Sequence, residues 1–153
     1  MQRLLIAPTL ALCLLPGTGA ASVEDARAAR VMWTAFECGK CAQLAEKEDR
    51  SVALYELGVG AGRQFYGALE AGTITEEELS EYAPFVLNSL AAGPSIDFII
   101  GRVFQYAVVA ANDDVSKEDQ YGLPLPMGEW LLEPEKITAK ADLLYTAGNC
   151  DLL

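Results

Sequence analysis

Two cysteines lie three positions apart in the segment Cys38-Gly-Lys-Cys41, a spacing that is used for thiol-disulfide chemistry. Such a redox pair needs a lowered thiolate pKa, which a helix N-terminus and a nearby lysine can provide. Residues 22–37, however, have the pattern of a helix and not of a strand, so the pair is expected in mid-helix, away from the positive end of the dipole. Redox activity of Cys38 and Cys41 is therefore the alternative function and not the preferred one.

Cys150, close to the C-terminus, gives the same cysteines a structural role. At about 100° per residue, Cys38 falls among the apolar side chains of its helix and Cys41 among the polar ones. An inward-facing Cys38 can pair with Cys150 and attach the tail to the first helix, which leaves Cys41 as a free thiol. We favour this pairing, although the spacing leaves a second one open: Cys41 can replace Cys38 in the bond, because the two are only three positions apart.

The chain has no histidine, and this absence excludes several kinds of chemistry. Ser/His/Asp triads, Cys/His pairs and His-ligated zinc or haem all need an imidazole. Attachment of a c-type haem is also excluded, because Ala42 follows Cys41 where the motif requires histidine. The sequence therefore predicts no metal and no cofactor. Glu37 is a carboxylate whose pKa could be raised for acid catalysis, but its helical angle places it on the polar side and no second carboxylate stands out.

Arg63 and Arg102 each follow a glycine, and Asp97 lies five residues before Arg102 in a largely apolar segment. A charge in such a segment needs a partner. Paired arginines could build a pocket for an anion or a carboxylate. We favour the simpler interpretation, in which the arginines form structural ion pairs with Asp97 or with nearby glutamates.

The chain carries 22 acidic and 11 basic residues, a formal charge of −11. Nucleic acids and anionic membranes are bound by clustered lysine and arginine, so neither is an expected partner.

The first 20 residues have the pattern of a secretory signal peptide: an early arginine, an apolar run over residues 4–15, and small residues before a cleavage site near Ala20 or Ala21. We expect residues 21–153 to form a single helical domain in the periplasm or outside the cell. No later stretch is long and apolar enough for stable membrane insertion.

Helical spacing of apolar residues fills most of this domain, and no segment alternates as a strand does. The expected helical segments are 22–46, 51–72, a turn opened by a capping box at Thr75, a short stretch at 85–92, 96–111 and 134–147. The segment 96–111 is the most apolar and is predicted to be the core helix. Residues 112–128 are expected to be an irregular binding loop or surface strap. The fold class is therefore all-α, one compact bundle of about five helices with a disulfide-stapled C-terminal tail.

Three glycines predict close packing between helices. Gly58 and Gly62 lie on one face of the segment 51–72, and Gly101 is the expected counterpart in the segment 96–111. A nucleotide-binding loop is the weaker interpretation of the first two, because the spacing and the preceding strand are missing.

Three stretches carry a resemblance: Ala35-Phe-Glu-Cys38, Gly93-Pro-Ser-x-Asp-Phe-x-x-Gly-Arg102 and Asn149-Cys150. Together the chain resembles an uncharacterised family of small bacterial proteins with signal peptides. The resemblance supports the pairing of Cys38 with Cys150, does not account for Cys41, and implies no activity.

The preferred hypothesis is a secreted or periplasmic helical binding or accessory protein without catalytic activity. Its partner, a protein or a small molecule, is expected near the segment 96–111 and the loop 113–128.

Overall fold

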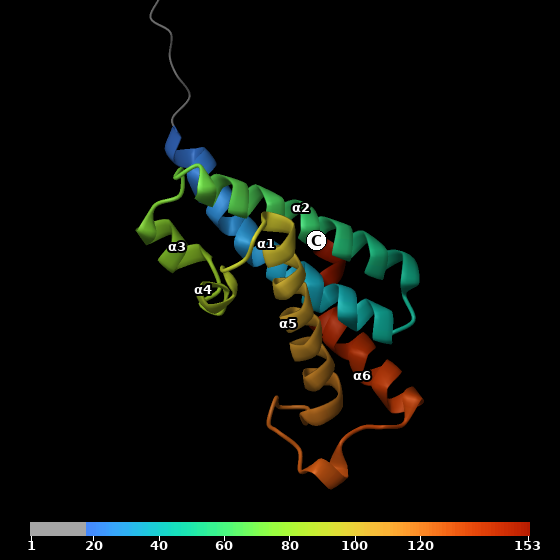
Figure 1. The fold of residues 1–153 in the computed structure, drawn as a ribbon. Helices are drawn as coiled ribbons and strands as arrows, with labels where there is room; N and C mark the ends of the chain where they lie inside the picture. Colours follow the sequence, from blue (N-terminus) through green and yellow to red (C-terminus); the bar gives the residue numbers. More distant parts are fainter. Residues whose placement is uncertain (1–17) are drawn as a thin grey trace, which may run out of the picture.

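The helices of this computed structural model, which describes residues 18–153, pack into one bundle without any strand (Figure 1). The four long helices are α1 (Thr18–Leu44), α2 (Glu48–Glu70), α5 (Ile96–Lys117) and α6 (Pro134–Ala147). The short helices α3 (Glu76–Tyr82) and α4 (Leu87–Leu90) lie between α2 and α5 in the chain. A disulfide joins Cys38 to Cys150 in the C-terminal tail. The predicted all-α bundle with a stapled tail is therefore confirmed.

Helix α1 is the central helix, because α2, α5 and α6 all pack against it (Figure 1). Its Phe36 side chain is fully buried and meets the ring of Phe104 of α5 edge-on, with 5.3 Å between the ring centroids. The prediction that segment 96–111 is the core helix is wrong. Helix α5 buries one side only and leaves Phe98 and Tyr106 about half exposed on the other.

Small residues let α2 approach α1 closely. A Cβ atom at Gly58 would collide with the ring of Phe36, and one at Gly62 would lie 2.9 Å from Ile100 Cγ1 of α5. Gly101, the expected counterpart, is exposed and has nothing within 4 Å of such a Cβ atom. It is the neighbouring Ile100, turned inward, that fills the space beside Gly62.

Local signals set the helix boundaries that the sequence predicted best. The Thr75 hydroxyl accepts a hydrogen bond from the amide of Glu78, whose carboxylate accepts one from the Thr75 amide in return. The Ser95 hydroxyl caps α5 by accepting a hydrogen bond from the amide of Phe98, and Pro134 occupies the first turn of α6.

Helix α5 extends to Lys117, six residues beyond its expected end, so the irregular loop is shorter than predicted. Buried Val115 continues the apolar side of the helix, and Lys117 pairs with Asp113 one turn earlier at 2.7 Å. Within the loop, residues Met127–Glu129 form one turn of 3₁₀ helix.

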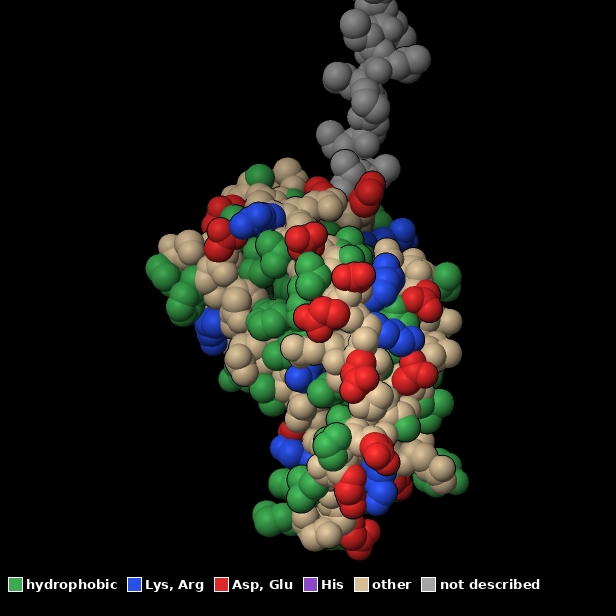
Figure 2. Space-filling view, turned by 90° about the vertical axis from the view of Figure 1, so that its right-hand side faces the viewer, with side chains coloured by type: hydrophobic (Ala, Val, Ile, Leu, Met, Phe, Trp, Pro, Cys, Tyr) green, Lys and Arg blue, Asp and Glu red, His purple; other side chains and the backbone are tan. Residues whose placement is uncertain are grey.

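Most of the expected signal peptide, residues 1–17, lies outside the described residues. Helix α1 begins at Thr18, so the expected cleavage near Ala20 or Ala21 falls in its first turn. None of the described helices combines the length and the hydropathy that a membrane crossing requires. Acidic side chains are scattered over the face of the molecule drawn in Figure 2, with hydrophobic side chains gathered between them.

Candidate functional site

The α5–α6 loop, residues 118–133, folds back onto the end of α5 instead of extending into solvent. The amides of Leu125 and Leu131 donate hydrogen bonds to the carbonyl oxygens of Lys117 and Ser116, at 2.7 and 2.8 Å. These two bonds hold the two arms of the loop beside the same helix end.

Asp119 fixes the first turn of this loop. One carboxylate oxygen accepts hydrogen bonds from the amides of Tyr121 and Leu123, at 2.7 and 2.9 Å. These bonds hold the pKa of Asp119 below its usual value, because they stabilise the ionised carboxylate. Gly122, between the two donors, has φ of +76°, a conformation in which a side chain would be strained.

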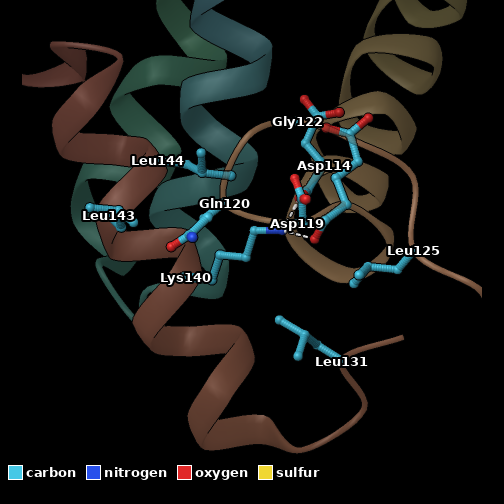
Figure 3. Close-up of a pocket in the computed structure, with 10 residues that line it drawn as sticks. Asp114, Asp119, Gln120, Gly122, Leu125, Leu131, Lys140, Leu143 and Leu144 are labelled. Atoms are coloured by element: carbon cyan, nitrogen blue, oxygen red, sulfur yellow. Dashed lines mark hydrogen bonds between the residues drawn. The ribbon is translucent and has the colours of Figure 1, made fainter. Parts of the chain in front are cut away.

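A cavity of about 500 Å³ lies between this loop, the end of α5 and the second half of α6; we call it the loop pocket. Its walls are mainly apolar, with four leucines from the loop and α6, and the labelled side chains in Figure 3 surround the open space. The lining residues are Asp114, Glu118, Asp119, Gln120, Gly122, Leu125, Leu131, Lys140, Leu143 and Leu144.

Lys140 of α6 crosses the pocket toward the end of α5 (Figure 3). Its ammonium group donates hydrogen bonds to the carbonyl oxygens of Asp114 and Glu118, at 2.6 and 2.5 Å. These carbonyls belong to the end of a helix, where they have no helical donor and where the dipole favours a cation. Lys140 therefore caps α5 and joins it to α6.

The carboxylates in the pocket come from α5 and from the start of the loop. Burial raises the pKa of Asp114 above its usual value, and the nearby Glu118 carboxylate raises it further. The Lys140 ammonium acts in the opposite direction and does not cancel the increase. Asp114 is thus a partly buried carboxylate that is held in unfavourable electrostatic surroundings.

A smaller cavity of about 270 Å³ shares Asp114 and Leu144 with the loop pocket and reaches the disulfide. Glu37 and Cys41 of α1 also line it. Burial raises the pKa of Glu37, a hydrogen bond with the Trp33 side chain lowers it, and the Asp114 carboxylate raises it. The second carboxylate near Glu37, which the sequence did not single out, is therefore Asp114.

The disulfide uses Cys38 and leaves Cys41 as a thiol. Cys41 was expected to face outward, but it is buried, because residues of α5, α6 and the tail face this side of α1. Burial, together with the Asp114 and Glu37 carboxylates, raises the pKa of Cys41 to about 11. A thiol with this pKa is protonated at neutral pH and is a poor nucleophile.

The tail has further attachments besides the disulfide. Arg50 of α2 donates hydrogen bonds to the Cys150 carbonyl oxygen at 3.0 Å and to the Tyr145 hydroxyl at 3.2 Å. The Tyr145 hydroxyl in turn donates to Asp151 at 2.5 Å. The disulfide and this polar network together attach the tail to the helices, which is a structural role.

The two arginines that could have formed an anion site lie in separate interactions. Arg63 pairs with Asp97, with 2.9 Å between Nε and Oδ1, and both side chains are mostly exposed. Arg102 donates hydrogen bonds to the carbonyl oxygens of Leu90, the last residue of α4, and of Ala92, at 3.3 and 2.5 Å. Arg63 thus forms an ion pair with Asp97, whereas Arg102 binds backbone carbonyl oxygens and not a carboxylate.

No protein-family model, curated protein or solved structure matches the chain. The resemblance to small exported bacterial proteins therefore stays a prediction. Within residues 18–153, no three acidic or cysteine side chains come together in a way that could hold a metal ion. The loop pocket is the candidate site, and sequence analysis anticipated only its loop. Its α6 wall was missed, because Lys140, Leu143 and Leu144 have the spacing of an ordinary amphipathic helix.

Proposed function

We propose that this chain is an exported helical binding protein without catalytic activity, and that the loop pocket holds a small, largely apolar molecule. The observation that carries the proposal is the cavity of about 500 Å³ with four leucines around it. Small-molecule sites have about this volume and are lined mainly by apolar side chains with a few polar groups. A cavity of this kind beside a charged helix end is suited to an amphipathic molecule.

The frame around the pocket supports a binding role. Backbone hydrogen bonds from Leu125 and Leu131 hold the loop on α5, and Lys140 joins α5 to α6. A site that is formed before the ligand arrives loses less conformational entropy on binding.

Other features favour export and the absence of catalysis. The N-terminal pattern is that of a signal peptide, and a disulfide is typical of an oxidising compartment. The chain lacks histidine, and the free thiol among residues 18–153, Cys41, is buried with a raised pKa. Turnover of a substrate by the purified protein, lost when one carboxylate or thiol is replaced, would refute this part of the proposal.

Titration of ¹⁵N-labelled protein with 1-octanol tests the binding site. We expect amide shifts in residues 118–133 and around Leu143, and saturation with increasing octanol. Leu143→Trp places a large side chain at the pocket and should abolish these shifts. Val52→Trp changes another exposed apolar residue, which belongs to α2 and lies outside the pocket lining, and should leave the shifts intact. Absence of saturable shifts, or shifts confined to other surfaces, would overturn the proposal.

A further inference from the structure

The end of α5 carries an unusual concentration of negative charge. Asp113, Asp114 and Glu118 lie in its last turn and at its C-terminal cap, where the helix dipole disfavours carboxylates. Asp114 and Glu118 are also four positions apart, a spacing at which like charges on a helix repel. Such an arrangement needs compensation from a cation.

Two of the neighbouring carboxylates have that compensation within the fold. Asp113 pairs with Lys117, and Asp119 accepts the two backbone hydrogen bonds of the loop turn. The carboxylates of Asp114 and Glu118 neither accept a hydrogen bond nor form an ion pair with any residue in the range 18–153. Both of them line the loop pocket.

Lys140, the one cationic residue of the pocket lining, does not pair with these carboxylates. Its ammonium hydrogens point to the carbonyl oxygens of Asp114 and Glu118 and not to their carboxylates. The lining holds the carboxyl groups of Asp114, Glu118 and Asp119 against the single ammonium group of Lys140, so its formal charge is negative. In Figure 3 the labelled carboxylates, Asp114 and Asp119, lie near the end of α5, whereas Leu143 and Leu144 belong to α6.

We infer that the loop pocket selects a small primary ammonium ion carried on an aliphatic body, with the ammonium bound by Asp114 and Glu118. The aliphatic body then lies against Leu131, Leu143 and Leu144. Charge-assisted hydrogen bonds to the two free carboxylates favour this ligand over a neutral one, and a carboxylate ligand is repelled. The inference rests on the proposed function, because it names the ligand class for the same pocket.

Three probes of equal chain length separate the two claims: octylammonium, 1-octanol and octanoate. Measured by amide shifts at neutral pH and low salt, octylammonium should bind about tenfold more tightly than 1-octanol, and octanoate most weakly. In Asp114→Asn/Glu118→Gln, the preference for octylammonium over 1-octanol should disappear. Asp113→Asn, outside the pocket lining, is the matched control and should retain the preference.

The outcomes are distinct. Binding of 1-octanol at the pocket with equal or weaker binding of octylammonium would overturn this inference and leave the proposed function standing. Tightest binding of octanoate would instead point to Lys140 as the recognising group. If none of the three probes binds, both claims fail. The comparison of probes on the unmodified protein decides the question even if the double variant does not fold.

Discussion

Replacement of Cys150 by serine should remove a large part of the stability of this domain. The disulfide joins α1 to the tail across a sequence separation of 112 residues. In the chain-entropy model, opening a loop of that length lowers the free energy of unfolding by about 5 kcal/mol. A domain of ordinary size is stable by about 5–15 kcal/mol, so the loss is a third of the total or more. With an unfolding entropy of roughly 2.1 cal/mol/K per residue, the expected fall in Tm is about 17 °C.

Urea unfolding followed by circular dichroism measures this effect. Cys38→Ser and Cys150→Ser should lower the free energy of unfolding equally. Addition of a thiol reductant should destabilise the unmodified protein by a similar amount. Cys41→Ser is the control, because it leaves the disulfide in place and should lower the free energy of unfolding far less. In a separate measurement, alkylation and intact mass of the exported protein should show one free thiol and cleavage near Ala20 or Ala21. A loss below about 1 kcal/mol for Cys150→Ser, or equal losses for Cys41→Ser and Cys38→Ser, would refute the reasoning.

Two further predictions concern α1 and its contacts. Gly58→Ala should destabilise the fold by about 1–2 kcal/mol in urea unfolding, because the new methyl group meets the ring of Phe36. Gly60→Ala faces open space and should stabilise the fold by about 0.5–1 kcal/mol. An increase in stability for both variants would contradict the packing described for α2. Burial raises the pKa of Glu37 above the usual 4.5, so its contribution to stability is present below that pH and is lost as the pH rises through the folded-state pKa. The Tm of Glu37→Gln should therefore rise relative to that of the unmodified protein as the pH is raised from acid to neutral. A Tm difference between the two proteins that does not change with pH would count against this explanation.

The sequence predicted those parts of the fold that depend on neighbouring residues. The capping box at Thr75, the cap at Ser95 and the first turn at Pro134 are set by local hydrogen bonding and by the fixed geometry of proline. The spacing left two pairings of Cys150 open; the favoured one, with Cys38, is the one that the structure contains.

The predictions from sequence were wrong where tertiary packing determines the extent of a helix or the burial of a side chain. Residues 112–117 look like a loop because of Asn-Asp-Asp, yet burial of Val115 continues α5 through them. Cys41 appeared to lie on a polar side of α1, but α1 is covered on several sides, so its buried sector is wider than in a surface helix. For the same reason the sequence predicted segment 96–111 as the core helix, whereas in the structure α1 has that position.

The candidate site could be predicted only in part for a related reason. The glycines and prolines after residue 121 marked a loop, but not the direction in which it folds. That direction depends on backbone hydrogen bonds to Ser116 and Lys117 and on the reach of Lys140 from α6. None of these contacts has a signature in local sequence.

The central claim is that the loop pocket binds a small, largely apolar molecule, and contacts between protein and ligand protons test it most directly. In protein with labelled leucine methyl groups, bound 1-octanol should give intermolecular nuclear Overhauser effects to Leu131, Leu143 and Leu144. Effects to these methyl groups that disappear in Leu143→Trp would support the site. Effects only to other surfaces, such as the exposed side of α5 at Phe98 and Tyr106, or none at saturating octanol, would contradict it.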